Sequence, residues 1–435
     1  MKIGIIGAGA AGMSGAWDFV NAGHEVSIFE AEPRVGGLAA GFKDEGWDWW
    51  LEKFYHHWFQ TDVDVLRLAE EMGVREKVLF PRPKTSFWID GKIVRSEISP
   101  SAIFLPLALW PKFRFGLGGV RLKLMPSWQA LEETTAHEWL LSNMGQEGYD
   151  KFFRPLLIGK FGEEYTKVNM AWMWARVKAR SLRLGTFEGG FQAYLDTLAA
   201  ALEQKGAAIH LGTPVSSIGE ANGNPTLTVN GETHLFDRIL ATTSPGLLLK
   251  LAPGLRDTDY GRNIGSLRTI GAVCVVLATR QQLLTDGTYW LNLPATSADK
   301  RKSQFPFLAL VEHTNWMDRA HYNGDRILYL GDYVPTDHEY FSMSDEELIE
   351  RFAAVLPTFN PDYRPEWIRK AWVFRAPYAQ PVPYVNHSER VPAIETPLAN
   401  VFWASMNHVY PWDRGTNYAI ELGRRAARQM MDMSE

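Results

Sequence analysis

Gly7-Ala8-Gly9-Ala10-Ala11-Gly12 decides the fold, because it places a Gly-x-Gly-x-x-Gly turn between an apolar stretch and a helical pattern. A strand is predicted over residues 3–6 and a helix over residues 9–22. In such a turn the first glycine permits the tight bend, the second lets the backbone approach a pyrophosphate, and the third lets helix and strand pack closely. The helix start adds free N–H groups for the phosphates. The turn therefore predicts a dinucleotide site that includes Ala10 and Ala11.

A carboxylate follows at the expected place. A second strand is predicted over residues 26–29 and ends at Glu30. An acid there accepts the ribose hydroxyls of a dinucleotide and repels a 2′-phosphate, so NADP is disfavoured. The alternative is a glycine turn that serves structure alone, and the combination of strand, turn, helix and terminal acid outweighs it.

The residues after Glu30 point to FAD through a resemblance. Ala31-Glu32-Pro33-Arg34-Val35-Gly36-Gly37 resembles the motif of the large FAD family that includes amine oxidases, protoporphyrinogen oxidases, phytoene desaturases and UDP-galactopyranose mutase. In that family the Gly-Gly backbone passes against the second phosphate and the ribityl chain, and the arginine anchors the loop. The resemblance implies that FAD is bound by Ala31, Arg34, Gly36, Gly37 and Leu38.

The resemblance continues along the chain. Pro214-Val215 is similar to the family's strand against the adenine, which implies a backbone contact from Val215. The stretch 410–417 precedes the last predicted helix, where the family brings a helix N-terminus to the flavin pyrimidine. Positive potential there stabilises a reduced flavin, which implies a catalytic role for Arg414. Flavin contacts are implied for Gly415, Thr416 and Asn417, while capping of their own helix by Thr416 and Asn417 is a compatible alternative.

A histidine pair lies in the stretch 54–62, which resembles the mutase segment that places a histidine beside the flavin. In that alignment His57 takes the place of the flavin-side histidine. Gln60 stands where the mutase has a second histidine, so nucleotide-sugar chemistry is not carried over. We predict that His57 lines the active site and acts in catalysis, with a hydrogen-bonded structural role as the alternative. Neither His56 nor His57 has zinc-type spacing to another ligand, so no metal site is predicted.

Several features bear on the substrate. Relatives of amine oxidases commonly carry a basic residue directly after the Gly-Gly, where this chain has Leu38, and residues 272–278 contain no lysine of the kind that amine oxidases place against the flavin. Amine oxidation is therefore disfavoured. The stretch 155–162 resembles the substrate-domain motif of protoporphyrinogen oxidases. An aromatic wall for a flat or isoprenoid-like ligand is predicted from six tryptophans, with core packing as the alternative for each: Trp47, Trp49, Trp50, Trp58, Trp172 and Trp174.

The predicted fold is α/β, with a glutathione-reductase-like Rossmann-type FAD domain from residues 1–75, 185–245 and 395–435. The segments 76–184 and 246–394 would form an interleaved substrate domain with a mixed sheet and a helical lobe. The predicted function is oxidation or desaturation of a sizeable apolar or aromatic substrate by hydride transfer to flavin N5. Without a second Gly-x-Gly-x-x-Gly for NADPH, the acceptor would be dioxygen, a quinone or another carrier. A redox-neutral isomerase and a non-catalytic flavoprotein are the alternatives.

Composition limits the partners and the compartment. The net charge is −5 and no basic stripe dominates, which argues against nucleic acid. Cys274 is the single cysteine, which suits the cytoplasm. No apolar stretch reaches the roughly 20 residues that cross a bilayer. From Ile98 to Leu131 apolar residues and cations alternate without an acid. This composition fits either a peripheral membrane segment or a pair of solvated helices, and the sequence alone favours the helices.

Overall fold

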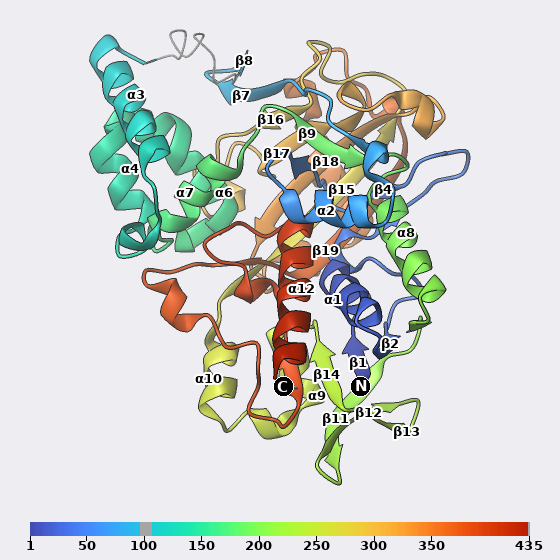
Figure 1. Cartoon of the computed structure of the whole chain (residues 1–435). Coiled ribbons are helices and arrows are strands. Elements are labelled where there is room, and N and C mark those ends of the chain that lie inside the picture. Colours follow the sequence, from blue (N-terminus) through green and yellow to red (C-terminus); the bar gives the residue numbers. More distant parts are fainter. Residues whose placement is uncertain (96–106, 434–435) are drawn as a thin grey trace.

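The computed structural model describes residues 1–95 and 107–433. It contains a parallel sheet and a larger mixed sheet, each covered by helices, so the prediction of an α/β fold is confirmed (Figure 1).

The parallel sheet is built from segments that lie far apart in the sequence. In spatial order its strands are β10 (Ala208–His210), β2 (Glu25–Phe29), β1 (Lys2–Ile6), β14 (Arg238–Ala241) and β20 (Val401–Trp403). Every neighbouring pair is parallel. Because the carboxyl ends of parallel strands meet at one edge, the turn after β1, the acid after β2 and the loop after β20 come together there.

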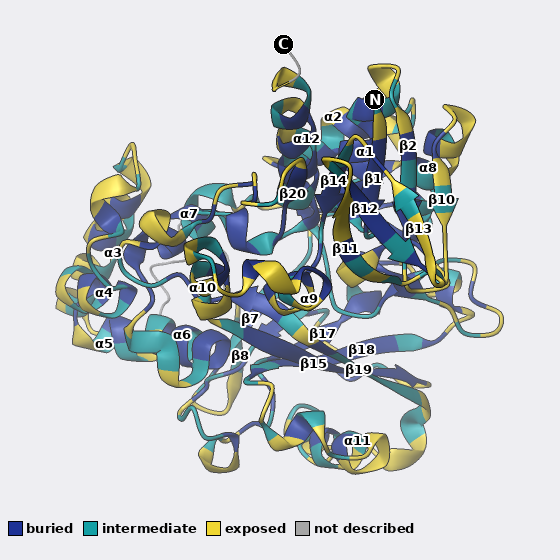
Figure 2. Cartoon of the chain, turned by 90° about the horizontal axis from the view of Figure 1, so that it is seen from below, coloured by how far each residue is buried: buried dark blue, intermediate teal, exposed yellow. Residues whose placement is uncertain are grey.

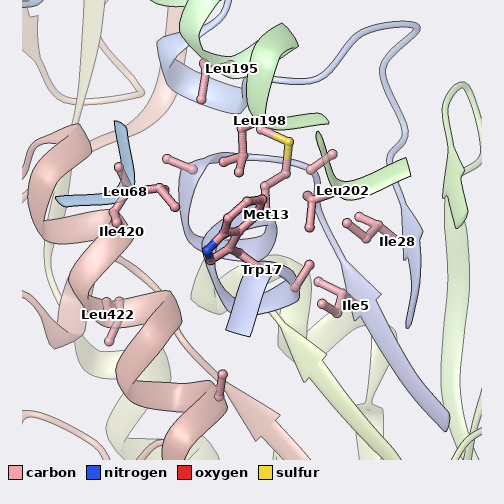
Figure 3. Packing of buried hydrophobic residues seen from close by; sticks show 14 of the residues in the cluster. Ile5, Met13, Trp17, Ile28, Leu68, Leu195, Leu198, Leu202, Ile420 and Leu422 are labelled. Carbon is pink, nitrogen blue, oxygen red and sulfur yellow. The ribbon is translucent and has the colours of Figure 1, made fainter. Parts of the chain in front are cut away.

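Four helices share a hydrophobic core with one set of residues of this sheet: α1 (Ala10–Asn21), α2 (Val63–Glu71), α8 (Phe191–Gln204) and α12 (Thr416–Asp432). Figure 3 shows their shared core, in which Met13, Leu198 and Ile420 converge. Helices α1 and α12 touch closely, because a Cβ on Gly423 would lie 2.0 Å from the Ala11 carbonyl oxygen. In α2, Val63 is the first residue of the helix and its side chain is 57% exposed, whereas Val65, Leu68 and Ala69 are buried.

An antiparallel meander extends this unit. It consists of β11 (Val215–Ala221), β12 (Asn224–Val229) and β13 (Glu232–Leu235). Helices α9 (Pro245–Leu251) and α10 (Asp259–Ser266) share a hydrophobic core with β1 and β14, through Leu248 and Ile264 against Ile6 and Ile239. These two helices therefore pack on the parallel sheet, although the sequence assigned residues 246–394 to the substrate domain. The division into domains stays a prediction.

The second sheet is mixed and larger. In spatial order its strands are β19 (Ile368–Pro381), β15 (Thr269–Thr279), β18 (Arg326–Val334), β17 (Ala309–Glu312), β16 (Trp290–Asn292), β7 (Thr85–Ile89) and β8 (Lys92–Arg95). Only the pairing of β16 with β7 is parallel among these described strands. Figure 2 shows this sheet between helix α11 (Asp345–Ala353) and the unit that holds the parallel sheet.

A helical lobe lies beside the mixed sheet. Its helices are α3 (Leu109–Leu124), α4 (Ala136–Met144), α5 (Gln146–Gly148), α6 (Arg154–Phe161) and α7 (Met170–Ala179). Helix α4 begins with a capping box between Thr135 and Glu138. Among the described residues, no helix combines the length and the hydrophobicity that crossing a bilayer requires.

Short strands hold the segment that connects the two sheets. They are β3 (Gly41–Phe42), β4 (Leu51–Glu52), β5 (Trp58–Phe59), β6 (Val78–Leu79) and β9 (Leu184–Phe187). Strand β4 pairs with β3, and β5 pairs with β9. The loop 53–57 between β4 and β5 is thereby anchored at both ends, and it carries the histidine pair.

Candidate functional site

The glycine turn between β1 and α1 has no room for a side chain at its first and third glycines. Gly7 has φ of +105°, and a Cβ there would lie 2.6 Å from Thr242 Oγ1. A Cβ on Gly12 would lie 2.0 Å from the Gly7 carbonyl oxygen. Gly9 is the N-cap of α1, and within residues 1–95 and 107–433 no side chain caps this end, so the first N–H groups remain available to an anion. Ala10 opens the helix and is buried, and Ala11 follows it.

A second glycine pair lies against this turn. The Gly36 N–H donates to the Ala8 carbonyl oxygen at 2.9 Å, and Gly36 forms a parallel bridge with Gly9. Gly37 has φ of +56°, and the atom nearest to a Cβ on Gly9 would be Gly37 Cα, at 4.0 Å. Two stretches of bare backbone therefore form a cradle between them. The Arg34 guanidinium lies over the Trp50 ring at 4.2 Å, which holds the loop through a cation–π contact.

The acid after β2 faces the same turn. One carboxylate oxygen of Glu30 accepts from the Ala8 N–H at 2.8 Å, and the other accepts from the Glu32 N–H at 2.9 Å. The Thr213 N–H donates to the Glu30 carbonyl oxygen at 2.7 Å, which brings the start of β11 at Val215 alongside. Ala31 is exposed next to Glu30. A carboxylate has further lone pairs, so ribose hydroxyls can bind Glu30 in addition to these contacts.

Helix α12 begins at this edge of the sheet without a side-chain cap. Its N-cap is Gly415, and no side chain of the described residues accepts from its first N–H groups. The Asn417 side-chain oxygen instead accepts from the backbone N–H groups of Asp64 and Val65, at 2.9 and 3.0 Å. The expected capping of α12 by Asn417 is therefore wrong, because its amide turns toward the free N–H groups of α2. Contact of Gly415, Thr416 and Asn417 with a flavin stays a prediction.

A pocket separates the glycine loops from the mixed sheet. Its floor comes from β15, β18 and β19, and its opposite wall comes from Leu38, His56 and Arg414. The lining residues are Leu38, Phe54, Tyr55, His56, Ala272, Val273, Cys274, Gly331, Asp332, Tyr333, Ala376, Ala379 and Arg414. The six tryptophans of the expected aromatic wall are not among them; Trp58, for example, is fully buried against Phe191 and Tyr194. The pocket is mostly apolar, and its cation is Arg414.

The two histidines occupy different surroundings. His56 lines the pocket, whereas His57 packs against the rings of Phe59 and Trp290 at centroid distances of 5.2 and 6.1 Å. Burial, with Arg414 nearby, lowers the pKa of His56 to about 4. Burial, with Arg180 nearby, lowers the pKa of His57 to about 3, so both rings are neutral at pH 7. His57 Nδ1 is buried without a partner among the described residues, which leaves it available to a group outside the chain. Its catalytic role stays a prediction.

Arg414 faces the pocket from the other side. Its guanidinium hydrogen-bonds to the Tyr333 hydroxyl and lies 5.2 Å from the centre of that ring. Burial lowers the pKa of Arg414 to about 10, so the group keeps its charge at neutral pH. Its Nε is buried and has no hydrogen-bond partner in the described part of the chain. An unpaired buried donor on a pocket wall is a place for an acceptor on a ligand.

A cluster of cations adjoins Arg414. Asp413 accepts from Lys160 at 2.8 Å, from Trp172 Nε1 at 3.2 Å, and from Arg176. Burial pushes the pKa of Asp413 upward, but Lys160 and Arg176 hold it well below its ordinary value. Arg180 has no hydrogen bond or ion pair with any described residue. The cations outnumber the single carboxylate, so the potential beside the pocket is positive.

Sequence reasoning missed part of this arrangement. Lys160 and Asp413 lie within motifs that the sequence analysis quoted, but nothing in them indicated that the two side chains pair. Tyr333 and Cys274 lie within strands and carry no local signal of their own. Their positions in the pocket follow from strand pairing, in which Ala272 is opposite Tyr333 and Cys274 is opposite Gly331.

The residues present fit FAD. The backbone cradle of Gly9 and Gly37 suits a pyrophosphate, because side chains would fill it. The Glu30 carboxylate lies beside this cradle, where it can accept from ribose hydroxyls. The unpaired Arg414 Nε belongs to a residue that lines the pocket. Leu38, which directly follows Gly37, lines the same pocket. Together these groups could hold FAD, with its nucleotide near the cradle and its flavin near the pocket.

Comparisons with known proteins agree with this geometry. A model of the family described as flavin-containing amine oxidoreductases matches residues 10–431. The 15-cis-phytoene desaturase of Glycine max is 23% identical over 394 residues, which cover 83% of this chain and 66% of the relative. A structure described as a protoporphyrinogen oxidase from Exiguobacterium sp. 255-15 has a TM-score of 0.78 at 17% identity, with 100% and 99% of the two chains covered. Reduced UDP-galactopyranose mutase has a TM-score of 0.76 at 17% identity, with 99% and 96% covered.

The solved structures, the curated relatives and the family model support different conclusions. At 17% identity the two solved structures show the fold, which is the glutathione-reductase-like type that the sequence predicted. The matches to curated relatives span between 13% and 66% of the length of those relatives. The family match covers nearly the whole of this chain.

Proposed function

The chain belongs to the family of flavin-containing amine oxidoreductases, with FAD as its cofactor, and we propose that it oxidises or desaturates a sizeable, largely apolar or aromatic molecule. The resemblance stated from the sequence is thereby confirmed at the level of the family. The observation that carries the substrate proposal is the pocket, which Phe54, Ala272, Val273 and Ala376 make largely apolar. Similarity to proteins named phytoene desaturase and protoporphyrinogen oxidase supports the same class of reaction.

The protein residues would orient the substrate and manage charge. Bound FAD supplies the hydride acceptor at N5. The aromatic and aliphatic side chains over β15, β18 and β19 exclude water and hold a flat or extended substrate against the opposite wall. Arg414 and the uncapped start of α12 would supply positive potential to a flavin bound at that wall, which would stabilise its reduced form. The neutral His57 would form a hydrogen bond through its unpaired Nδ1.

The electron acceptor belongs to the same proposal. The chain carries no second Gly-x-Gly-x-x-Gly for a nicotinamide cofactor. We therefore expect dioxygen, a quinone or another small carrier to reoxidise the flavin. Stopped-flow reoxidation of the reduced protein by dioxygen and by a soluble quinone distinguishes the first two of these acceptors.

A second candidate is a redox-neutral isomerisation of an anionic substrate. The observation that favours it is the excess of cations around Asp413, with Arg180 unpaired among the described residues. A phosphate or carboxylate on a substrate would balance this charge. Similarity in fold to UDP-galactopyranose mutase is consistent with such a substrate.

One experiment separates the candidates. Oxidised protein is mixed anaerobically with porphyrinogens, polyprenes and nucleotide sugars while the flavin absorbance is recorded. Bleaching by a porphyrinogen or a polyprene supports oxidation. Conversion of a nucleotide sugar only by chemically reduced protein supports the isomerase. If no compound reacts and sulfite does not reach N5, the pocket is closed and the protein is a non-catalytic flavoprotein.

A further inference from the structure

Helix α3, which spans Leu109–Leu124, exposes a continuous stripe of large apolar side chains. The stripe consists of Leu109, Trp110, Phe113, Leu117, Val120 and Leu124, whose exposed fractions lie between 55% and 87%. At about 100° of rotation per residue, all six positions fall within one arc of about 100°. A single exposed leucine is ordinary, but six large apolar side chains on one helix face form a contiguous patch that marks an interaction site.

The opposite face of α3 is already packed. Phe115 contacts the Phe152 ring at a centroid distance of 5.3 Å, and Leu122 is buried. Gly118 lies so close to α4 that a Cβ there would meet Met144 Sδ at 2.6 Å. The lobe therefore holds α3 by its inner face, and Figure 1 shows the helix at the outer edge of that lobe. In Figure 2 much of its surface has the colour of exposed residues.

Cations flank the stripe on both sides. At the same rotation per residue, Lys112 and Lys123 fall on one border of the arc, and Arg114 and Arg121 fall on the other. Arg114 donates to the Ser142 carbonyl oxygen at 2.6 Å and Arg121 to Asn143 Oδ1 at 2.8 Å, so both guanidinium groups have neutral partners there. The sequence from Ile98 to Leu131 contains no acidic residue.

We propose that α3 lies in the surface of an anionic lipid membrane, with its apolar stripe among the acyl chains and its flanking cations at the headgroups. An apolar arc bordered by lysine and arginine is the pattern of helices that lie in a membrane interface. Anionic headgroups complement all four cations at once. A second copy of this chain fits poorly, because two facing stripes would bring cations together without an acid to pair with them.

The structure thus changes the balance between two sequence-based alternatives. Solvated helices were favoured over a peripheral membrane segment for residues 98–131, but solvated helices do not account for six exposed apolar side chains on one arc. Part of that segment, with Ile103, Phe104 and Leu105, lies outside the described residues. The proposal rests on 109–124 alone, and it is independent of the reaction that the pocket performs.

Vesicle sedimentation of the FAD-bound protein tests the proposal. Vesicles of phosphatidylcholine with about one third phosphatidylglycerol are compared with vesicles of pure phosphatidylcholine. We expect binding to the anionic vesicles, at least about tenfold weaker binding to neutral vesicles, and weakening as salt is raised. The double variant Trp110→Gln with Phe113→Gln should lose at least about tenfold in binding. Lys123→Gln should lose about fivefold, which is the effect of one cation near such a surface.

A matched control removes exposed apolar side chains elsewhere. Leu235 and Leu247 are exposed on β13 and α9, so Leu235→Gln with Leu247→Gln should leave vesicle binding unchanged. All variants should keep their FAD and melting temperature, since every substituted side chain is exposed. Wild-type protein that stays in the supernatant overturns the proposal, as does equal binding to neutral vesicles. A lipid-free dimer that the Trp110→Gln and Phe113→Gln variant dissociates would assign the stripe to a second copy instead.

Discussion

The glycine turn after β1 contacts Gly36, and Leu38, two residues further on, lines the pocket over the mixed sheet, yet the turn and the pocket depend on different physical quantities. In the turn the limiting quantity is volume, because a Cβ on Gly12 would overlap the Gly7 carbonyl oxygen. Beside the pocket, next to Arg414, the limiting quantity is charge, because one carboxylate, Asp413, holds Lys160 and Arg176 in a largely buried cluster. The two regions should therefore be sensitive to different substitutions. Near the pocket, a substitution that keeps the shape of a side chain but removes its charge should be harmful. In the turn, a substitution that adds a methyl group should be harmful.

Asp413→Asn should give the largest effect, because it keeps the shape and removes the charge. Removing one partner of a buried ion pair leaves uncompensated charge and typically costs about 3–5 kcal/mol. The free energy of unfolding, measured by denaturant titration at pH 7, should fall by that amount. The pKa of Asp413 is lowered in the folded state, so its contribution is present at neutral pH and is lost as the pH falls through that folded pKa. The gap between wild type and variant should therefore narrow in acid.

The control for this change is an exposed pair. Asp259 bonds Arg262 at 2.6 Å with a side chain that is 99% exposed, so Asp259→Asn should cost little. If both substitutions lower the free energy of unfolding by the same small amount, water screens the Asp413 cluster. Charge would then not be the limiting quantity near the pocket.

Gly12→Ala tests the turn side. Its new methyl group would lie 2.0 Å from the Gly7 carbonyl oxygen, and overpacking of this kind costs about 1–3 kcal/mol and sometimes more. We expect a lower melting temperature together with loss of FAD, measured by thermal unfolding and by flavin absorbance after desalting. Gly246→Ala in α9 is the matched control, since nothing lies within 4 Å of its Cβ and it should be neutral or slightly stabilising. Identical behaviour of the two variants would show that the turn relaxes around a side chain.

Glu30→Ala asks whether the turn also uses a side chain. The variant loses hydrogen bonds from ribose hydroxyls to a charged acceptor, so FAD binding should weaken by about 1–3 kcal/mol. Isothermal titration of the apoprotein with FAD measures this, and Glu32→Ala, at a neighbouring exposed position, should bind as the wild type does. If Glu30→Ala binds FAD with unchanged affinity, the backbone of the turn alone binds the nucleotide.

The histidine pair carries the smallest expected effect. His57→Ala or His57→Gln should slow flavin reduction by at least about tenfold, the low end of what a positioned acid, base or electrostatic partner contributes. FAD content and melting temperature should stay near those of the wild type. Stopped-flow reduction with a substrate found by anaerobic mixing is the measurement, and His56→Ala is run in parallel.

The structure makes this pair decisive, since His56 and not His57 is among the residues that line the pocket. Slow reduction in His56→Ala with normal reduction in His57→Ala would move the role to His56. If the flavin is reduced at the wild-type rate in both variants, the two histidines contribute only to packing.

Much of the dinucleotide unit was readable from sequence. Strand, turn, helix and Glu30 follow one another within 30 residues, and their conformations depend on local sterics such as the positive φ of Gly7. The family resemblance extended this reading to the α/β fold and to FAD. Prediction failed where a side chain had more than one neighbour to choose from, as with Asn417, which caps α2 rather than its own helix.

By itself, then, the sequence determined the glycine turn, because the turn depends on residues that are close along the chain, and the family resemblance added the class of fold and the cofactor. Only the tertiary structure decided which side chains form the pocket. The register of β15 against β18 brings Cys274 and Tyr333 to one cavity, and the pair of Lys160 and Asp413 next to Arg414 joins residues that are 253 positions apart. Such contacts depend on how distant strands pair and on which charges can be buried together. Neither can be predicted from a short stretch of sequence.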